Sequence, residues 1–308
     1  MGKLAFVCAG QGSQLLGMGV DFVGRSSWGA DFFEEAKAIS GLDIFDLCTN
    51  GPAEELDQVN NQLPCLVAAS LASARALGER GLQPDCVAGF GIGEYAAHAI
   101  AGTADLECLL TLASRVGALA AMAGHLTPSA TALLKGCSAE QAQELCERHG
   151  ASALYLSAVL SPSSVMVAGK ADAVQAALDE HLAAGGAGQR ISCAAALGTP
   201  LAQSVASGMA MALKHTLLGP GELPLYCNLN GEPFDHMRSP ELLGGALTAP
   251  VRWDKVVESM LDAGVDRMVQ CGPGGMLLEA AQELAAQHGV ELSVARAATV
   301  HDVACILI

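Results

Sequence analysis

Residues 89–94 read Gly-Phe-Gly-Ile-Gly-Glu and lie between an apolar, strand-like run and an alanine-rich, helix-like segment. A strand that turns sharply into a helix through Gly-x-Ser-x-Gly presents the serine hydroxyl as a nucleophile for acyl transfer or hydrolysis. The outer glycines of such a turn are present as Gly89 and Gly93, but the middle position is Gly91. The sequence therefore predicts the turn of a nucleophilic enzyme without its nucleophilic side chain.

The elements around this turn alternate between strand-like and helix-like patterns, which predicts an α/β fold with a mainly parallel sheet flanked by helices. From about residue 128 the pattern changes to β-α-β-β-α-β, the order of a ferredoxin-like unit. We therefore expect a large α/β domain formed by residues 1–127 and 197–308. The ferredoxin-like subdomain at 128–196 would be inserted into it.

The charge balance restricts the partners. Of the 308 residues, 51% are apolar and 16% are charged, and the formal net charge is −16 at pH 7. Such a surface repels phosphate, so we expect neither nucleic acid nor an anionic membrane as a partner. No run approaches 18 uninterrupted apolar residues, and the N-terminal apolar run resembles a first strand rather than a signal peptide. These features predict a cytoplasmic protein.

Eleven cysteines are spread along the chain without a Cys-x-x-Cys pair or the Cys/His spacing of a metal site. Most lie within apolar runs, so we interpret them as reduced core thiols of an intracellular protein. We expect no metal and no cofactor.

Five stretches resemble, in order, malonyl-CoA:acyl carrier protein transacylases and related polyketide acyltransferase domains. They are AGQGSQLLGMG, GFGIGEYAAHAIAG, SRVGALAAMA, LTAPVRWDKVV and QCGPGGML, and the resemblance covers essentially the whole chain. It implies an α/β-hydrolase-like large domain with an inserted ferredoxin-like subdomain. In that family a serine attacks the thioester of malonyl-CoA, and the malonyl group then passes to the phosphopantetheine thiol of a carrier protein.

The resemblance places glycines at both positions of the family's catalytic dyad. Gly91 stands where the nucleophilic serine would be, and Gly198, in ALGTPLA, stands where the basic histidine would be. Acyl transfer through a covalent intermediate needs both a nucleophile and an adjacent base. The standard mechanism is therefore predicted to be absent.

Four residues match substrate-binding positions of the family. Gln11 and Ile92 would donate backbone N–H groups to an oxyanion hole. Arg115 would pair bidentately with the malonyl carboxylate, and Gln62 would line the pocket. Simpler interpretations that need no ligand are also open. The loop that contains Gln11 could merely close the first strand–helix turn, Arg115 could be an exposed or ion-paired helix residue, and Gln62 could be a glutamine at the start of a helix.

A relocated nucleophile or base is the open alternative. His98, two helical turns beyond Gly91, is interpreted as a helix-packing residue, whereas His125 could approach the cleft from a loop. Cys8, Cys193 and Cys271 adjoin the matched motifs, but their apolar neighbours indicate inert core thiols.

The sequence thus predicts a family member that is inactive by the standard mechanism. It would act by binding a carrier protein, an acyl-CoA, or an active acyltransferase or synthase of fatty-acid or polyketide synthesis. The alternative is an active acyltransferase or thioesterase that uses a relocated nucleophile or water.

Overall fold

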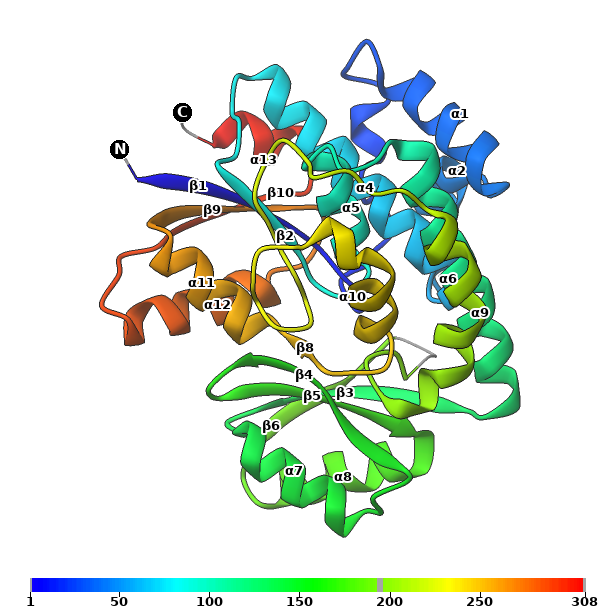
Figure 1. Ribbon diagram of the computed structural model, residues 1–308, viewed down its shortest axis with the longest axis vertical. Coiled ribbons are helices and arrows are strands. Elements are labelled where there is room, and N and C mark those ends of the chain that lie inside the picture. The colour runs from blue at the N-terminus through cyan, green and yellow to red at the C-terminus, as the bar shows by residue number, and fades with distance from the viewer. Residues whose placement is uncertain (1, 193–195, 307–308) are drawn as a thin grey trace.

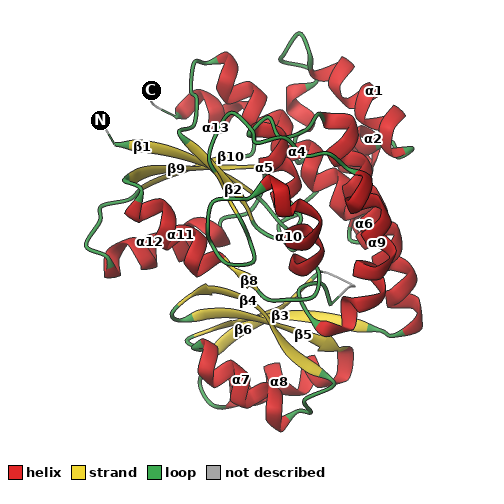
Figure 2. Ribbon diagram, viewed as in Figure 1, coloured by secondary structure: helices red, strands yellow, loops and turns green. Residues whose placement is uncertain are grey.

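The computed structural model describes residues 2–192 and 196–306, and two five-stranded sheets organise it (Figures 1 and 2). The first sheet is parallel throughout and has the order β10–β9–β1–β2–β7. Its strands are β1 (Lys3–Cys8), β2 (Cys86–Gly89), β7 (Leu225–Tyr226), β9 (Val265–Cys271) and β10 (Ser293–Ala297). This is the mainly parallel α/β sheet that the alternating pattern predicts.

Helices cover both faces of the first sheet, so its strands are apolar on both sides. In β1, Phe6 and Cys8 pack into one apolar cluster with α4, α5 and α6, whereas Ala5 and Val7 face a second cluster with α11 and α12. The alternation follows from the two-residue period of a strand.

The helices outside the second sheet are α1 (Gly29–Ser40), α2 (Ile44–Asn50), α3 (Ala53–Leu56), α4 (Val59–Glu79), α5 (Gly93–Ile100), α6 (Leu106–Leu126), α9 (Gln203–His215), α10 (Ser239–Ala246), α11 (Trp253–Asp262), α12 (Met276–Gln287) and α13 (Val300–Cys305), with short 3-10 turns at Val20–Phe22, Pro200–Ala202 and His236–Arg238.

Helix α6 is, by length and composition alone, apolar enough to cross a membrane. Its apolar residues Leu109, Leu110, Leu112 and Val116 are instead buried in the cluster that α4 and α9 share.

The second sheet has the order β6–β3–β5–β4–β8 and lies below the first in Figure 1. Its strands are β3 (Ser129–Lys135), β4 (Leu154–Ser161), β5 (Ser164–Lys170), β6 (Ala187–Ile191) and β8 (Val251–Arg252), and its helices are α7 (Ala139–Arg148) and α8 (Ala171–Ala183). The antiparallel β6–β3–β5–β4 part, with two helices on one face, has the order of the predicted ferredoxin-like unit. The boundaries at 128 and 196 remain a prediction.

One strand of the second sheet comes from outside the predicted insertion. Residues 251 and 252, immediately before α11, form β8 and pair in parallel with β4. The open face of this sheet then packs on α11 and α12, where Leu160 and Met166 share a buried cluster with Trp253. The Ser161 hydroxyl also donates to Glu283 Oε2 of α12 at 2.6 Å. The two sheets therefore share an apolar core.

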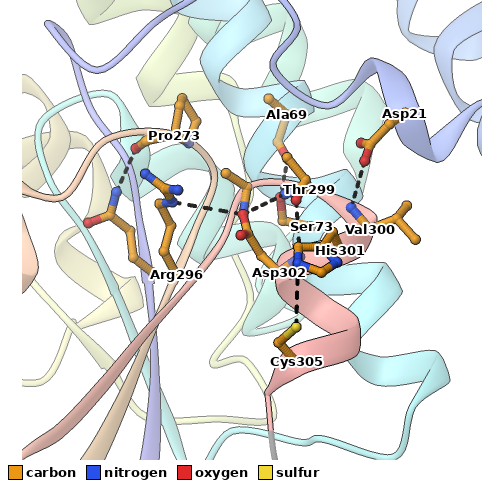
Figure 3. A network of polar contacts seen from close by, with 12 residues as sticks. Asp21, Ala69, Ser73, Pro273, Arg296, Thr299, Val300, His301, Asp302 and Cys305 are labelled. Atoms are coloured by element: carbon orange, nitrogen blue, oxygen red, sulfur yellow. Dashed lines mark hydrogen bonds and ion pairs between the residues drawn. The ribbon is translucent and has the colours of Figure 1, made fainter.

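Polar contacts fix the last helix, α13, against the N-terminal part of the chain (Figure 3). Thr299 Oγ1 accepts a hydrogen bond from Asp302 N, and Asp302 Oδ2 accepts one from Thr299 N, each at 3.0 Å. This reciprocal pair is a capping box, which satisfies two backbone donors at the start of a helix. Val300 N donates to Asp21 Oδ2 at 2.7 Å, and Arg296 Nε lies 3.8 Å from Asp302 Oδ2.

Candidate functional site

The turn between β2 and α5 has the geometry that the sequence predicts for residues 89–94. Gly91, at its centre, has a φ of +55°, which favours glycine. The glycines on either side are required by space: a Cβ on Gly89 would lie 2.0 Å from the carbonyl carbon of Gly93, and one on Gly93 would lie 2.5 Å from Cys8 O. A Cβ on Gly91 itself would meet no heavy atom within 4 Å. The turn therefore has open space at the position where it would present a side chain.

Asn228 holds this turn in place through its side-chain amide. Its Oδ1 accepts a hydrogen bond from Gly91 N at 3.3 Å, and its Nδ2 donates to Gly91 O at 3.1 Å. The same Nδ2 donates to Glu94 Oε2 at 2.8 Å, and the backbone N of Asn228 donates to Glu94 Oε1 at 3.1 Å. The chain pairs with β2 only over the two residues of β7 and then leaves the sheet, which brings Asn228 to the turn.

A cavity of about 70 Å³ lies at this turn, between the first sheet and the second. Five polar residues line it: Gln11, Glu94, Tyr95, Thr131 and Ser157. The other lining residues are apolar or glycine, namely Phe90, Gly91, Ile92, Val116, Ala158, Met166, Ile191, Leu197, Gly198, Leu243, Ala246, Leu247 and Val251. The cavity wall is therefore predominantly apolar, and both glycines of the predicted dyad form part of it.

The predicted oxyanion residues also lie at the cavity, and Gln62 lies behind them. Gln11 and Ile92 both line it, beside Gly91. Gln62, on α4, is fully buried and is not among the lining residues. Its Oε1 accepts from Gln11 Nε2 at 3.4 Å, and its Nε2 donates to Ser192 O at 2.7 Å. Gln62 thus positions the side chain of Gln11.

The prediction that Arg115 would face the cavity is wrong. Arg115 is exposed on α6, and its Nη2 donates to Gly208 O of α9 at 3.4 Å. The cavity is lined instead by the next residue, Val116. One residue corresponds to a rotation of roughly 100° around a helix, so Arg115 and Val116 point in different directions from α6. A one-residue displacement in matching the motif places the arginine on the wrong side.

Gly198 also lines the cavity. Its N–H donates to Leu247 O at 2.9 Å, and its φ is +74°. A Cβ at this position would lie 2.9 Å from the backbone oxygen of Ser157 and 3.4 Å from that of Ala249. Both the positive φ and the close backbone oxygen of Ser157 therefore disfavour a side chain at position 198.

The cavity also holds an ionisable group that sequence reasoning did not single out. Glu94 is fully buried, and desolvation raises the pKa of its carboxyl to about 7, although hydrogen bonds from Asn228 act in the opposite direction. Burial likewise raises the pKa of Tyr95. The signal for Glu94 was present in the sequence, because a carboxylate three residues beyond the centre of the turn must lie in the first turn of α5.

The relocated groups considered as alternatives do not line the cavity. His98 is buried on α5, its ring packs edge-on against Phe234, and desolvation lowers its pKa to about 3. His125 is exposed at the end of α6. Cys8 and Cys271 are buried in neighbouring strands, and desolvation raises the pKa of both thiols. Cys193 lies outside the described residues.

Comparison with known proteins gives matches along nearly the whole chain. The acyl transferase domain family matches residues 5–302. The malonyl CoA-acyl carrier protein transacylase of Escherichia coli K12 is 32% identical over 287 residues, covering 90% of this chain and 91% of the relative. That of Haemophilus influenzae is 30% identical and covers 90% of each chain.

Solved structures agree with these relatives. The malonyl-CoA:acyl carrier protein transacylase from Xanthomonas oryzae pv. oryzae superposes with a TM-score of 0.91 at 27% identity, covering 99% of this chain and 97% of that one. A malonyl-transacylase solved in complex with its type II polyketide acyl carrier protein gives 0.89 at 28% identity, covering 98% of each chain.

A strand–turn–helix elbow beside a cavity, between a parallel sheet and a ferredoxin-like sheet, defines an acyltransferase fold. The chain belongs to the malonyl-CoA:acyl carrier protein transacylase family of acyl transferase domains.

Proposed function

We propose that this protein binds an acyl thioester, as its CoA or carrier-protein derivative, at the elbow cavity without forming an acyl-enzyme. The observation that carries the proposal is that both glycines, Gly91 and Gly198, line the cavity where the family's mechanism needs a nucleophile and a base. Gly91 offers no side-chain heteroatom, and a histidine at Gly198 would collide with Ser157 O. Within the described part of the chain, no histidine lines the cavity.

The parts of the site that bind rather than react support the same proposal. Gln11 and Ile92 remain beside the turn, where backbone N–H groups would polarise a thioester carbonyl. Asn228 keeps the turn rigid through four hydrogen bonds to Gly91 and Glu94. A carrier protein as partner is supported by the relative solved in complex with its acyl carrier protein.

The proposal is tested by intact-protein mass spectrometry after incubation with an acyl-CoA and a holo-carrier protein. We expect no acyl adduct on the protein and no transfer above the rate without protein, while calorimetry detects binding of the acyl-CoA or of the carrier. An adduct on any residue, or catalysed transfer, would overturn the proposal. So would the absence of binding to both ligands.

A Gly91→Cys variant provides the positive control. It places a thiol in the open space at the start of α5, where a helix N-terminus favours the reactive thiolate. Thiol–thioester exchange needs no separate base once the thiolate is present. We expect this variant to collect an acyl adduct, which would show that thioesters reach the elbow in the natural protein as well.

A second candidate function rests on Glu94. A cavity-lining carboxyl with a pKa of about 7 is suited to act as a general base near neutral pH. In that case water would attack the thioester, and the protein would be a hydrolase rather than a binder. Hydrolysis that is abolished in Glu94→Gln, with thioester binding retained, would favour this function over the first.

A further inference from the structure

The charges around the elbow cavity differ from those that a carboxylated acyl group requires. The ionisable groups lining the cavity are Glu94 and Tyr95, and both are acids. Across residues 2–192 and 196–306, no arginine, lysine or histidine is among the lining residues. Residues 193–195 read Cys-Ala-Ala and so contain no basic side chain. The cavity therefore has no cation with which a buried carboxylate could pair.

Arg115, Arg190 and Arg252 each adjoin a lining residue in the sequence, but none of the three is among the lining residues. Arg115 is exposed, with its guanidinium on the carbonyl of Gly208 in α9. Val116 is fully buried and presents its apolar side chain to the cavity. Rotating α6 to exchange the two residues would expose Val116 and bury Arg115 in the cluster shared with α4. The packing of α6 thus fixes the apolar wall.

A carboxylate in this cavity would lose its hydration without adequate compensation. Thr131 and Ser157 are neutral and can at most donate hydrogen bonds, while Glu94, once ionised, would repel a second carboxylate. Burying an ion that lacks a counter-charge is far more costly than burying a neutral group of similar size. A neutral acyl chain instead meets side chains such as Val116, Met166 and Leu247, which favour it through apolar burial.

The apolar wall and the missing cation act in the same direction. We therefore infer, on the basis of the proposed thioester binding, that the cavity accepts a neutral acyl group and discriminates against acyl groups that end in a carboxylate.

The test compares butyryl-CoA with malonyl-CoA by isothermal titration calorimetry at pH 7.5. Both ligands carry the same CoA moiety, so a difference in affinity reports on the acyl group. We expect butyryl-CoA to bind at least tenfold more tightly. Malonyl-CoA binding as tightly as butyryl-CoA, or more tightly, would overturn this inference and leave the proposed function standing. Absence of binding by both CoA thioesters would overturn this inference, and it would overturn the proposed function as well if the holo-carrier protein also failed to bind.

Two variants test the cause of the preference. Val116→Arg puts a guanidinium on the cavity wall and is expected to reduce the preference for butyryl-CoA at least tenfold. Arg115→Ala, its matched control one residue away, is expected to leave the preference unchanged. If Arg115→Ala abolished the preference or Val116→Arg left it intact in a folded protein, the inference would fail.

Because an arginine at 116 can disturb the packing of α6, an independent measurement uses the Gly91→Cys variant, which keeps the cavity wall unchanged. We expect its new thiol to be acylated at least tenfold faster by butyryl-CoA than by malonyl-CoA, as measured by mass spectrometry of the peptide containing residue 91. The exposed natural thiol of Cys305 serves as the internal reference, because it is not among the lining residues. Equal rate ratios at the two thiols would contradict the inference.

Discussion

Gly91 and Gly198 differ in how much a side chain at each position would destabilise the fold. Gly91→Ala would suffer only the backbone cost of a positive φ, about 1 kcal/mol, because its Cβ meets open space. Gly198→Ala adds a 2.9 Å contact with the backbone oxygen of Ser157, so we expect a loss of about 3 kcal/mol in the free energy of unfolding. Urea unfolding followed by circular dichroism measures both, and equal losses would contradict the steric argument.

Some residues of the site can be predicted from the sequence, and others cannot. The glycines at 91 and 198 are visible in the motifs, and the structure shows that both line one cavity. The sequence does not reveal that Val116, and not Arg115, faces the cavity. Both residues stand within a single helical motif, and only the rotation of α6 decides which one faces inward. Asn228 was also missed, since its partners are 134 and 137 residues away in the chain.

At the scale of an element, α5 carries a buried glutamate and a buried histidine one helical turn apart, and their pKa values are shifted in opposite directions. Burial raises the pKa of Glu94 from 4.5 to about 7, so the folded state holds more protons than the unfolded state across that range. Its contribution to stability therefore falls as pH rises from 4.5 to 7. Burial lowers the pKa of His98 from 6.5 to about 3, so its contribution falls as pH decreases through that range.

These opposite slopes cancel where they overlap, so α5 contributes a plateau of stability between about pH 4.5 and 6.5. Glu94→Gln removes the pH dependence of stability that comes from the Glu94 carboxyl. Relative to the variant, the natural protein should lose on the order of 3 kcal/mol between pH 4.5 and 7. Urea unfolding of both proteins at several pH values measures this difference. A difference in stability that is independent of pH would show that folding leaves the pKa of Glu94 near its ordinary value.

Elements were predicted well where their own residues determine them. The ferredoxin-like order follows from local periodicity, and the capping residues of α6 and α7, Asp105 and Ser138, are present in the sequence. Elements that depend on distant partners were not predicted. Strand β8 has two residues and exists only because β4 offers it an edge. Strand β7 likewise ends after Tyr226, where hydrogen bonds to the elbow replace those of the sheet.

Over the whole molecule, the shared core predicts that the two sheets unfold together, although the second is formed mainly by one continuous segment. Leu160 and Met166 of the second sheet are buried in one cluster with Trp253, and separating the sheets would expose all three. Trp253 is completely buried, and its indole Nε1 donates to Leu277 O at 3.4 Å. Its fluorescence therefore reports on the junction between the second sheet and α12.

The chain has two tryptophans, so Trp28→Phe leaves Trp253 as the only tryptophan, whose emission can be excited selectively over that of the tyrosines. We expect its emission and the far-ultraviolet circular dichroism of this variant to change at the same urea concentration, as in a single cooperative transition. The physical reason is that the second sheet cannot leave without opening the cluster that also covers one face of the first sheet. If the emission shifted at a lower urea concentration than the circular dichroism, the second sheet would detach first, and the elbow cavity, which both sheets line, would open before the remainder of the fold.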